Sequence, residues 1–200
     1  MSSAWAQNQR AKAWQRVADE LSLPYLGKEN DLVSQFQGMR LFSRGRSRRF
    51  RHAIAGDTGD TKITIGDYRF RTGSGKNSST HVYTMCVLQS EQLAAPHCHL
   101  RPEMALFDKL GAMLGGQDIN FADDAEFSSA YVLQGEDETA IRELFDEQVR
   151  SWFVAKRGER FHFEVLGDRL AFHYGKRRSP DDVRHLMEQA LEVMNLLAKA

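Results

Sequence analysis

The sequence has 200 residues, of which 42% are hydrophobic and 27% charged, an ordinary composition for a globular protein with a sizeable core. Basic and acidic residues balance at 27 each, and this zero formal net charge argues against a dedicated nucleic-acid-binding domain. No run of 18 apolar residues predicts a membrane span, and the N-terminus lacks the apolar stretch of a signal peptide.

Two cysteines, Cys86 and Cys98, lie in apolar, strand-like runs. Secreted proteins of this size more often carry a disulfide framework, whereas reduced thiols in apolar runs are typical of buried core positions. We therefore expect two reduced thiols and a cytoplasmic location.

The first half of the chain changes from a helical to a strand-like period. Residues 4–22 repeat apolar side chains at helical spacing, and Pro24 follows them. From Met39 to Leu88 the period is two, and turn-rich stretches separate "RRFRHAIAG", "TKITIGDYRF" and "THVYTMCVL". The pattern predicts three antiparallel strands, with Gly66 marking a β-bulge.

Helical and strand-like patterns are mixed in the second half. Pro102 opens a predicted helix, "PEMALFDKLGAML", which is followed by short strands at "DINF" and "FSSAYVLQG". A helix capped by Asp137 runs on to Ala155. In "RFHFEVLGDRLAFHYGK" two alternating runs flank Gly167 and Asp168, which predicts a hairpin with a two-residue turn.

The last element is a helix with Ser179 as its N-cap, and its wide apolar stripe suits packing across a sheet. The order of elements predicts an α+β fold, mainly an antiparallel curved sheet packed by N-terminal, middle and long C-terminal helices. Residues 1–200 then form one domain, in which the helix within residues 1–24 could be semi-independent.

The loop "TGSGKNSS" resembles a phosphate-binding loop only superficially. A P-loop needs a glycine five positions before its Gly-Lys pair, where this chain has Phe70, and it needs a helix after the lysine. A strand follows here, so we interpret the loop as a hairpin connection.

Four histidines are candidate metal ligands. In a strand His97 and His99 point to the same face, as an H-x-H pair of zinc ligands would. In the predicted hairpin His162 faces His173, with Glu164 diagonal on the same face, and opposed β-carbons lie about 5 Å apart. The alternative is a polar outer face without a metal. No catalytic residues and no cofactor are predicted, because no G-x-S-x-G elbow or zinc-protease motif occurs.

The strongest charge feature is a basic run. Residues 40–51 contain six arginines and no acid, whereas residues 118–147 contain ten acids and one arginine. The candidate ligand-binding residues are Arg44, Arg46, Arg48, Arg49 and Arg51, which could meet an anionic surface. Aromatic residues are few among them, so a base-stacking platform is not indicated. The alternative is a solvated strand edge protected by charge.

Several strings resemble a set of uncharacterised bacterial proteins that share a domain of unknown function. They are "HLRPE", "DINF", "FSSAYVLQGEDETAIRELF" and "GDYRFRTGSGK", within about Phe36 to Arg150. The family tends to have Phe where this chain has His97, which favours a packing role there. The resemblance implies no reaction; some relatives are membrane-anchored upstream, and we expect no such segment here.

These observations favour a non-enzymatic cytoplasmic binding or scaffold domain that contacts a protein or an anionic surface. One alternative is a small metal-dependent hydrolase using His97, His99, His162 and His173. Another is self-association, for example as a homodimer, through the N-terminal helix with its two tryptophans.

Overall fold

The computed structural model describes residues 3–29, 31–103 and 118–199. Its centre is one eight-stranded sheet in the order β1-β2-β3-β4-β8-β7-β5-β6, with every neighbouring pair antiparallel and the sheet open at β1 and β6. The strands are Tyr25–Glu29 (β1), Arg46–Asp57 (β2), Lys62–Thr72 (β3), Ser79–Gln89 (β4), Ala95–Pro102 (β5), Tyr131–Gly135 (β6), His162–Gly167 (β7) and Arg169–His173 (β8).

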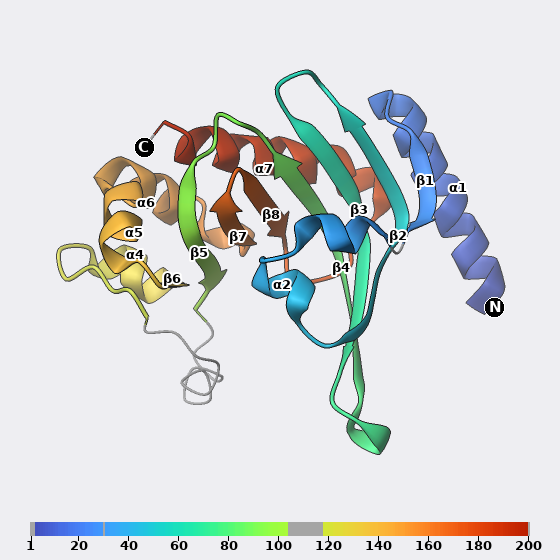
Figure 1. Ribbon diagram of the computed structural model, residues 1–200, viewed down its shortest axis with the longest axis horizontal. Helices are drawn as coiled ribbons and strands as arrows, with labels where there is room; N and C mark the ends of the chain where they lie inside the picture. Colours follow the sequence, from blue (N-terminus) through green and yellow to red (C-terminus); the bar gives the residue numbers. More distant parts are fainter. Residues whose placement is uncertain (1–2, 30, 104–117, 200) are drawn as a thin grey trace.

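Helices cover both faces of this sheet (Figure 1). The α-helices are Ser3–Leu21 (α1), Arg40–Ser43 (α2), Ala125–Ala130 (α4), Glu138–Leu144 (α5), Glu147–Ala155 (α6) and Val183–Leu197 (α7), and the 3-10 helices are Asp31–Phe36 (η1), Gly75–Asn77 (η2), Arg157–Glu159 (η4) and Pro180–Asp182 (η5). The predicted α+β class with a mainly antiparallel sheet is therefore confirmed.

The back face of the sheet, behind the strands in Figure 1, carries the larger core. Helix α7 lies across it and buries six side chains, and Trp14, Val17 and Ala18 of α1 join the same cluster. Full burial of a Val, Leu or Met side chain contributes about 1.5–3 kcal/mol. These contacts attach both terminal helices to the sheet, although the division of the chain into domains stays a prediction.

The front face carries a second core beneath the segment 31–43. Phe36 and Phe42 of this segment pack on Phe50 of β2 and Tyr68 of β3. The buried Glu164 of β7, which is remote in the sequence, holds this segment in place. Its carboxylate accepts hydrogen bonds from the backbone N–H groups of Arg40 and Leu41. A carboxylate at the first turn of a helix satisfies N–H groups that have no partner within the helix.

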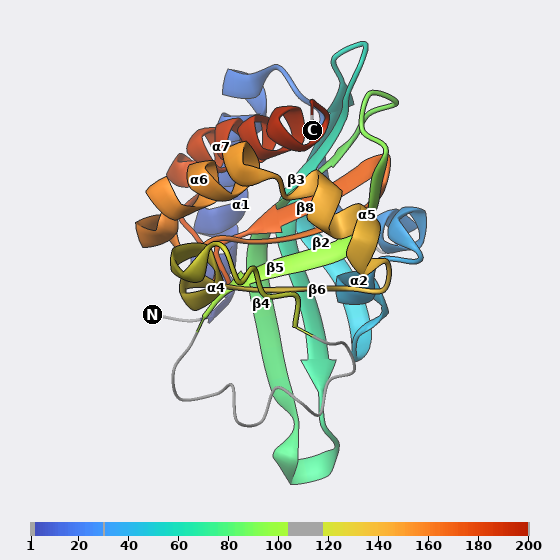
Figure 2. The same ribbon diagram turned by 90° about the vertical axis from the view of Figure 1, so that its left-hand side faces the viewer.

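Strands β2, β3 and β4 extend past the ends of their neighbours β1 and β8 and form a protruding β-arm with η2 at its tip (Figures 1 and 2). The β-arm consists of residues 46–49 of β2, 69–72 of β3 and 79–83 of β4. Strand β1 pairs only with Phe50 to Ile54 of β2, and β8 pairs with β4 only from Met85 onward. The loop that superficially resembles a P-loop forms this tip and leads directly into β4.

Two β-bulges in β2 change which side chains share a face. Between the pairs Arg46–Arg71 and Arg49–Arg69, two residues of β2 oppose one residue of β3, and Ser47 adopts a left-handed φ of 54°. A second bulge at His52 and Ala53 lies opposite Gly66, where an added Cβ would come within 3.1 Å of the Ala53 Cα. The bulge suggested by Gly66 is thus present, in the strand that it faces.

Other local predictions need correction or fall outside the described residues. The predicted helix 102–114 lies largely within residues 104–117, which the structure does not describe. The stretch "FSSAYVLQG" is not a strand throughout, because α4 continues to Ala130 and β6 begins at Tyr131. The single helix predicted from Asp137 to Ala155 is broken before α6, where Asp146 caps a new helix by accepting a hydrogen bond from the Val149 N–H.

Candidate anion-binding site

The five arginines predicted to bind an anion are divided between the two faces of the β-arm. Arg44 lies on the front, where its guanidinium is 6.0 Å from the Phe70 ring centre. Arg48 is also on the front, donating to the Ser43 carbonyl. The bulge at Ser47 moves Arg46, Arg49 and Arg51 to the back face, since all three pair in register with back-facing residues of β3.

Strand β3 adds two arginines that lie outside the basic run of residues 40–51. Arg69 and Arg71 follow Ile63 and Ile65 at a spacing of two, so they point to the back face with Arg46, Arg49 and Arg51. We call these five residues the arginine face. The spacing in "YRFRT" could have indicated them, once that strand was paired with the basic run.

Positive charges on the arginine face oppose one another directly. Arg46 pairs with Arg71 and Arg49 pairs with Arg69 across the ladder. Like charges in directly opposed positions destabilise a sheet. The pKa of Arg69 is lowered from its ordinary value, mainly by burial. The neighbouring guanidinium groups of Arg49, Arg51 and Arg71 lower this pKa further.

Acidic partners do not balance these charges. Among the residues that the structure describes, no carboxylate lies within ion-pair distance of any member of the arginine face. The Nε atoms of Arg49 and Arg71 are buried without a hydrogen-bond partner, while Arg51 donates to the Gln7 side chain of α1. The positive charge of the arginine face is therefore not compensated by an acid within the described residues.

The next rung of the same ladder shows the opposite arrangement. Asp67 is 2% exposed and faces Arg51, yet its oxygens accept from Arg10 Nε at 2.6 Å and from Arg10 Nη2 at 2.7 Å. Thr84 Oγ1 donates to the same carboxylate at 2.8 Å, and Arg177 Nε lies 3.3 Å away. Asp67 thus joins α1 to the sheet and is saturated, so it leaves the charge of Arg51 uncompensated.

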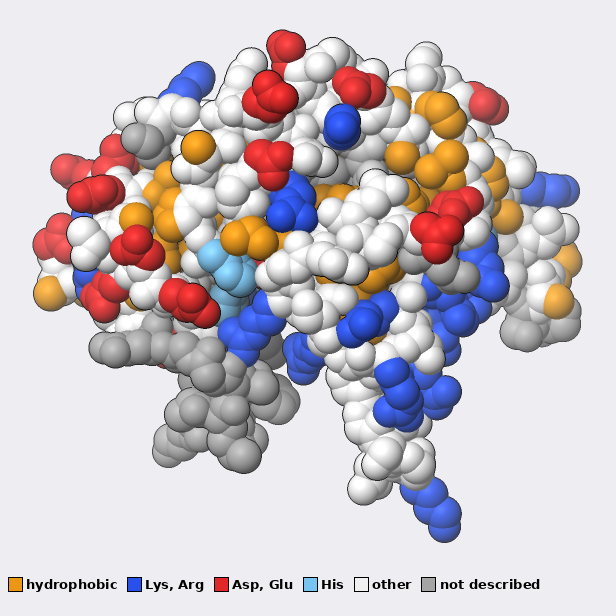
Figure 3. Space-filling model, viewed as in Figure 1, with side chains coloured by type: hydrophobic (Ala, Val, Ile, Leu, Met, Phe, Trp, Pro, Cys, Tyr) orange, Lys and Arg blue, Asp and Glu red, His pale blue; other side chains and the backbone are white. Residues whose placement is uncertain are grey.

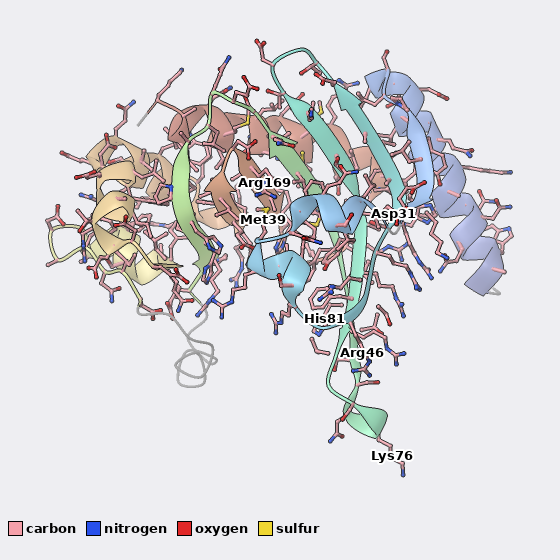
Figure 4. All side chains as sticks on the ribbon, viewed as in Figure 1. Asp31, Met39, Arg46, Lys76, His81 and Arg169 are labelled. Carbon is pink, nitrogen blue, oxygen red and sulfur yellow. The ribbon has the colours of Figure 1, made fainter. Side chains whose placement is uncertain are left out.

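The basic and acidic regions lie at opposite ends of the sheet. Lys and Arg side chains gather on the β-arm and beside α1, whereas Asp and Glu gather near α4 and α5 at the β6 end (Figure 3). Figure 4 shows Arg46 on the arm and Lys76 at its tip. The acidic region therefore does not neutralise the arginine face.

The histidines lie on the front face, and the predicted hairpin register is confirmed, since His162 pairs with His173. Their rings stack 4.9 Å apart at an interplanar angle of 10°, so their lone pairs lie in nearly parallel planes. The Gly175 N–H donates to Nδ1 of His173. Burial, followed by the charges of Arg101 and Arg160, lowers the pKa of His162 to about 4.

The other two histidines are hydrogen-bonded to different partners. His97 Nε2 is 2.8 Å from Glu164 Oε1, and His99 Nε2 is 2.7 Å from Gln134 Oε1. Within residues 3–29, 31–103 and 118–199, no three His, Cys, Asp or Glu side chains are grouped as metal ligands. The metal site at His97, His99, His162 and His173 stays a prediction, and the geometry gives it no assembled ligand set.

Two further sequence features are placed by the structure. Cys86 and Cys98 are free, buried thiols, and burial raises the pKa of both. Of the tryptophans in α1, Trp14 is fully buried in the back core, whereas Trp5 is 51% exposed.

None of the helices in the described part of the chain is long and apolar enough to cross a membrane.

Comparisons with known proteins indicate a fold but no family. No protein-family model and no curated protein matches the chain, in keeping with the resemblance to proteins without an assigned activity. Among solved structures, the crystal structure of the mycobacterial trehalose monomycolate transport factor A, TtfA, is similar with a TM-score of 0.61 and 11% sequence identity. The match covers 96% of this chain and 93% of that chain, and at this identity it shows the fold alone.

Proposed function

We propose that this protein is a non-enzymatic binding protein whose arginine face binds phosphate-bearing lipid headgroups at a membrane surface. The observation that carries the proposal is the direct cross-strand opposition of Arg46 with Arg71 and of Arg49 with Arg69, without acidic partners in the described residues. Guanidinium groups form strong, often bidentate hydrogen bonds with phosphate oxygens, and a bound phosphate would relieve their mutual repulsion.

Two observations favour a lipid surface over a nucleic acid. The large aromatic rings of the β-arm, Phe70 and Tyr83, pack into the front core, so none is available beside the arginines for base stacking. The similar fold of a protein described as a trehalose monomycolate transport factor adds support from a lipid-related process. Contact with the membrane would be peripheral and electrostatic.

Vesicle co-sedimentation tests the proposal. The protein should bind vesicles that contain phosphatidylserine, not vesicles of pure phosphatidylcholine, and binding should weaken as salt screens the charges. A basic residue at an anionic membrane is worth about 1 kcal/mol, so Arg49→Ser/Arg69→Ser should weaken binding roughly thirtyfold.

The matched control is Arg142→Ser/Arg157→Ser, which removes the same charge from exposed ion pairs at the acidic end. This control should bind vesicles as the unaltered protein does. Equal binding by Arg49→Ser/Arg69→Ser, or binding that does not depend on salt, would overturn the proposal. The proposal would also be overturned if the protein bound duplex DNA more tightly than vesicles and lost that binding in Arg49→Ser/Arg69→Ser, because the partner would then be a nucleic acid.

A further inference from the structure

A second polar site lies on the front of the molecule, across the sheet from the arginine face. It is an open depression of about 700 Å³ between the segment 31–43 and the start of β2. Figure 4 labels Asp31, where this segment begins, and Met39, just before helix α2. Its lining residues are Val33, Ser34, Gln37, Phe42, Ser43, Ser47 and Arg48. A cavity of this size is within the range of small-molecule sites.

The single charged residue of the lining is held in a fixed direction. Arg48 Nη1 donates to the Ser43 carbonyl at 2.6 Å and to the Gly45 carbonyl at 3.1 Å. Two carbonyl acceptors on one nitrogen orient the guanidinium, and its other N–H groups remain available for a ligand. Ser47 precedes it at the bulge, and its hydroxyl forms no hydrogen bond with the described residues. No carboxylate lines the depression, so its charge suits an anion.

The rest of the lining supplies hydroxyl and amide groups. Ser34 Oγ donates to the Asp31 carbonyl and Ser43 Oγ to the Met39 carbonyl, so both oxygens can still accept hydrogen bonds from a ligand. The Gln37 amide can both donate and accept. Phe42 and Val33 add apolar surface, against which the C–H groups of a ligand can pack.

We propose that this depression, hereafter the front pocket, binds a phosphorylated polyol such as a sugar phosphate. The phosphate contacts Arg48 and the Ser47 hydroxyl, and the polyol hydroxyls contact Ser34, Gln37 and Ser43. An isolated phosphate would make no use of those three groups, and an uncharged polyol would make no use of the charge of Arg48. The front pocket is separate from the arginine face and does not depend on its function.

Calorimetric titration with glucose 6-phosphate, inositol 1-phosphate, inorganic phosphate and glucose tests this proposal. At least one phosphorylated polyol should bind at a single site, more tightly than phosphate or glucose. Arg48→Ser should weaken that binding about tenfold or more, as expected for loss of hydrogen bonds to a charged group. Gln37→Ala should weaken binding of the phosphorylated polyol and leave that of inorganic phosphate unchanged.

Arg44→Ser is the matched control, because it removes the same charge from a neighbouring residue outside the lining. It should retain binding, and so should Arg49→Ser/Arg69→Ser, which separates this proposal from membrane binding. Vesicles containing phosphatidylinositol distinguish the two sources of the ligand. If the protein binds them more tightly than vesicles containing phosphatidylserine, and Arg48→Ser abolishes this difference, the ligand is a lipid headgroup. If the protein binds both kinds of vesicle equally, the ligand is a soluble molecule. Absence of saturable binding by both phosphorylated polyols, or equal binding by Arg48→Ser, would overturn the proposal.

Discussion

The two faces of the sheet accommodate crowded basic groups in different ways. On the front, the imidazoles of His162 and His173 stack, and burial lowers the pKa of both, so they remain neutral. On the back, Arg49 and Arg69 oppose each other as cations, because a guanidinium does not lose its proton in a protein. A histidine cluster can relieve repulsion by deprotonation, whereas an arginine cluster needs an anion.

Asp67 represents a third arrangement, in which an internal acid provides the compensation. Replacing it with Asn keeps the shape of the side chain and removes the charge that pairs with Arg10, whose side chain is only 13% exposed. Breaking one partner of a buried ion pair costs about 3–5 kcal/mol. We expect a loss of that size in the free energy of unfolding of Asp67→Asn, measured by urea denaturation. A loss below about 1 kcal/mol, the range of exposed pairs, would show that Asp67 does not hold α1 on the sheet.

The next largest effect concerns the neutral imidazoles. The pKa of His162 falls from 6.5 to about 4 on folding, so only the unfolded chain takes up this proton as the pH falls between these values. Stability is therefore retained above pH 6.5 and lost toward pH 4, by about 3 kcal/mol if the full shift applies. Unfolding free energies measured across this range should change less steeply for His162→Phe, which keeps an aromatic ring next to His173. An unchanged slope would contradict the assignment to His162.

The histidine pair and the arginine face also differ in how far the sequence could predict them. Two alternating runs around Gly167 and Asp168 set the register of the hairpin, so the pairing of His162 with His173 follows from the sequence. The composition of the arginine face depends on the bulge at Ser47, where a serine takes up a left-handed φ that is more typical of glycine, so the sequence does not mark the position of the bulge. A strand without this bulge would have placed Arg46 and Arg48 together.

Long-range contacts were the other part that the sequence could not provide. Glu164 caps a helix 124 residues away in the sequence, and Asp67 pairs with Arg10 across 57 residues. Apolar periodicity indicates which face of an element is buried, but it does not say which polar group of another element a carboxylate meets. The α+β class followed from the order of elements, whereas both of these contacts required the folded arrangement.

The smallest expected effect on stability is also the sharpest test of the arginine face. Arg49 and Arg69 repel each other and have no acidic partner in the described residues. The free energy of unfolding of Arg49→Ser/Arg69→Ser should therefore lie within about 0.5 kcal/mol of that of the unaltered protein. Pyrophosphate at ten times its dissociation constant should stabilise the unaltered protein by about 1.4 kcal/mol and the double variant much less. Sodium chloride at matched ionic strength controls for general screening. If the variant lost several kcal/mol without any anion, the arginines would serve the fold, and their crowding would no longer indicate an external ligand.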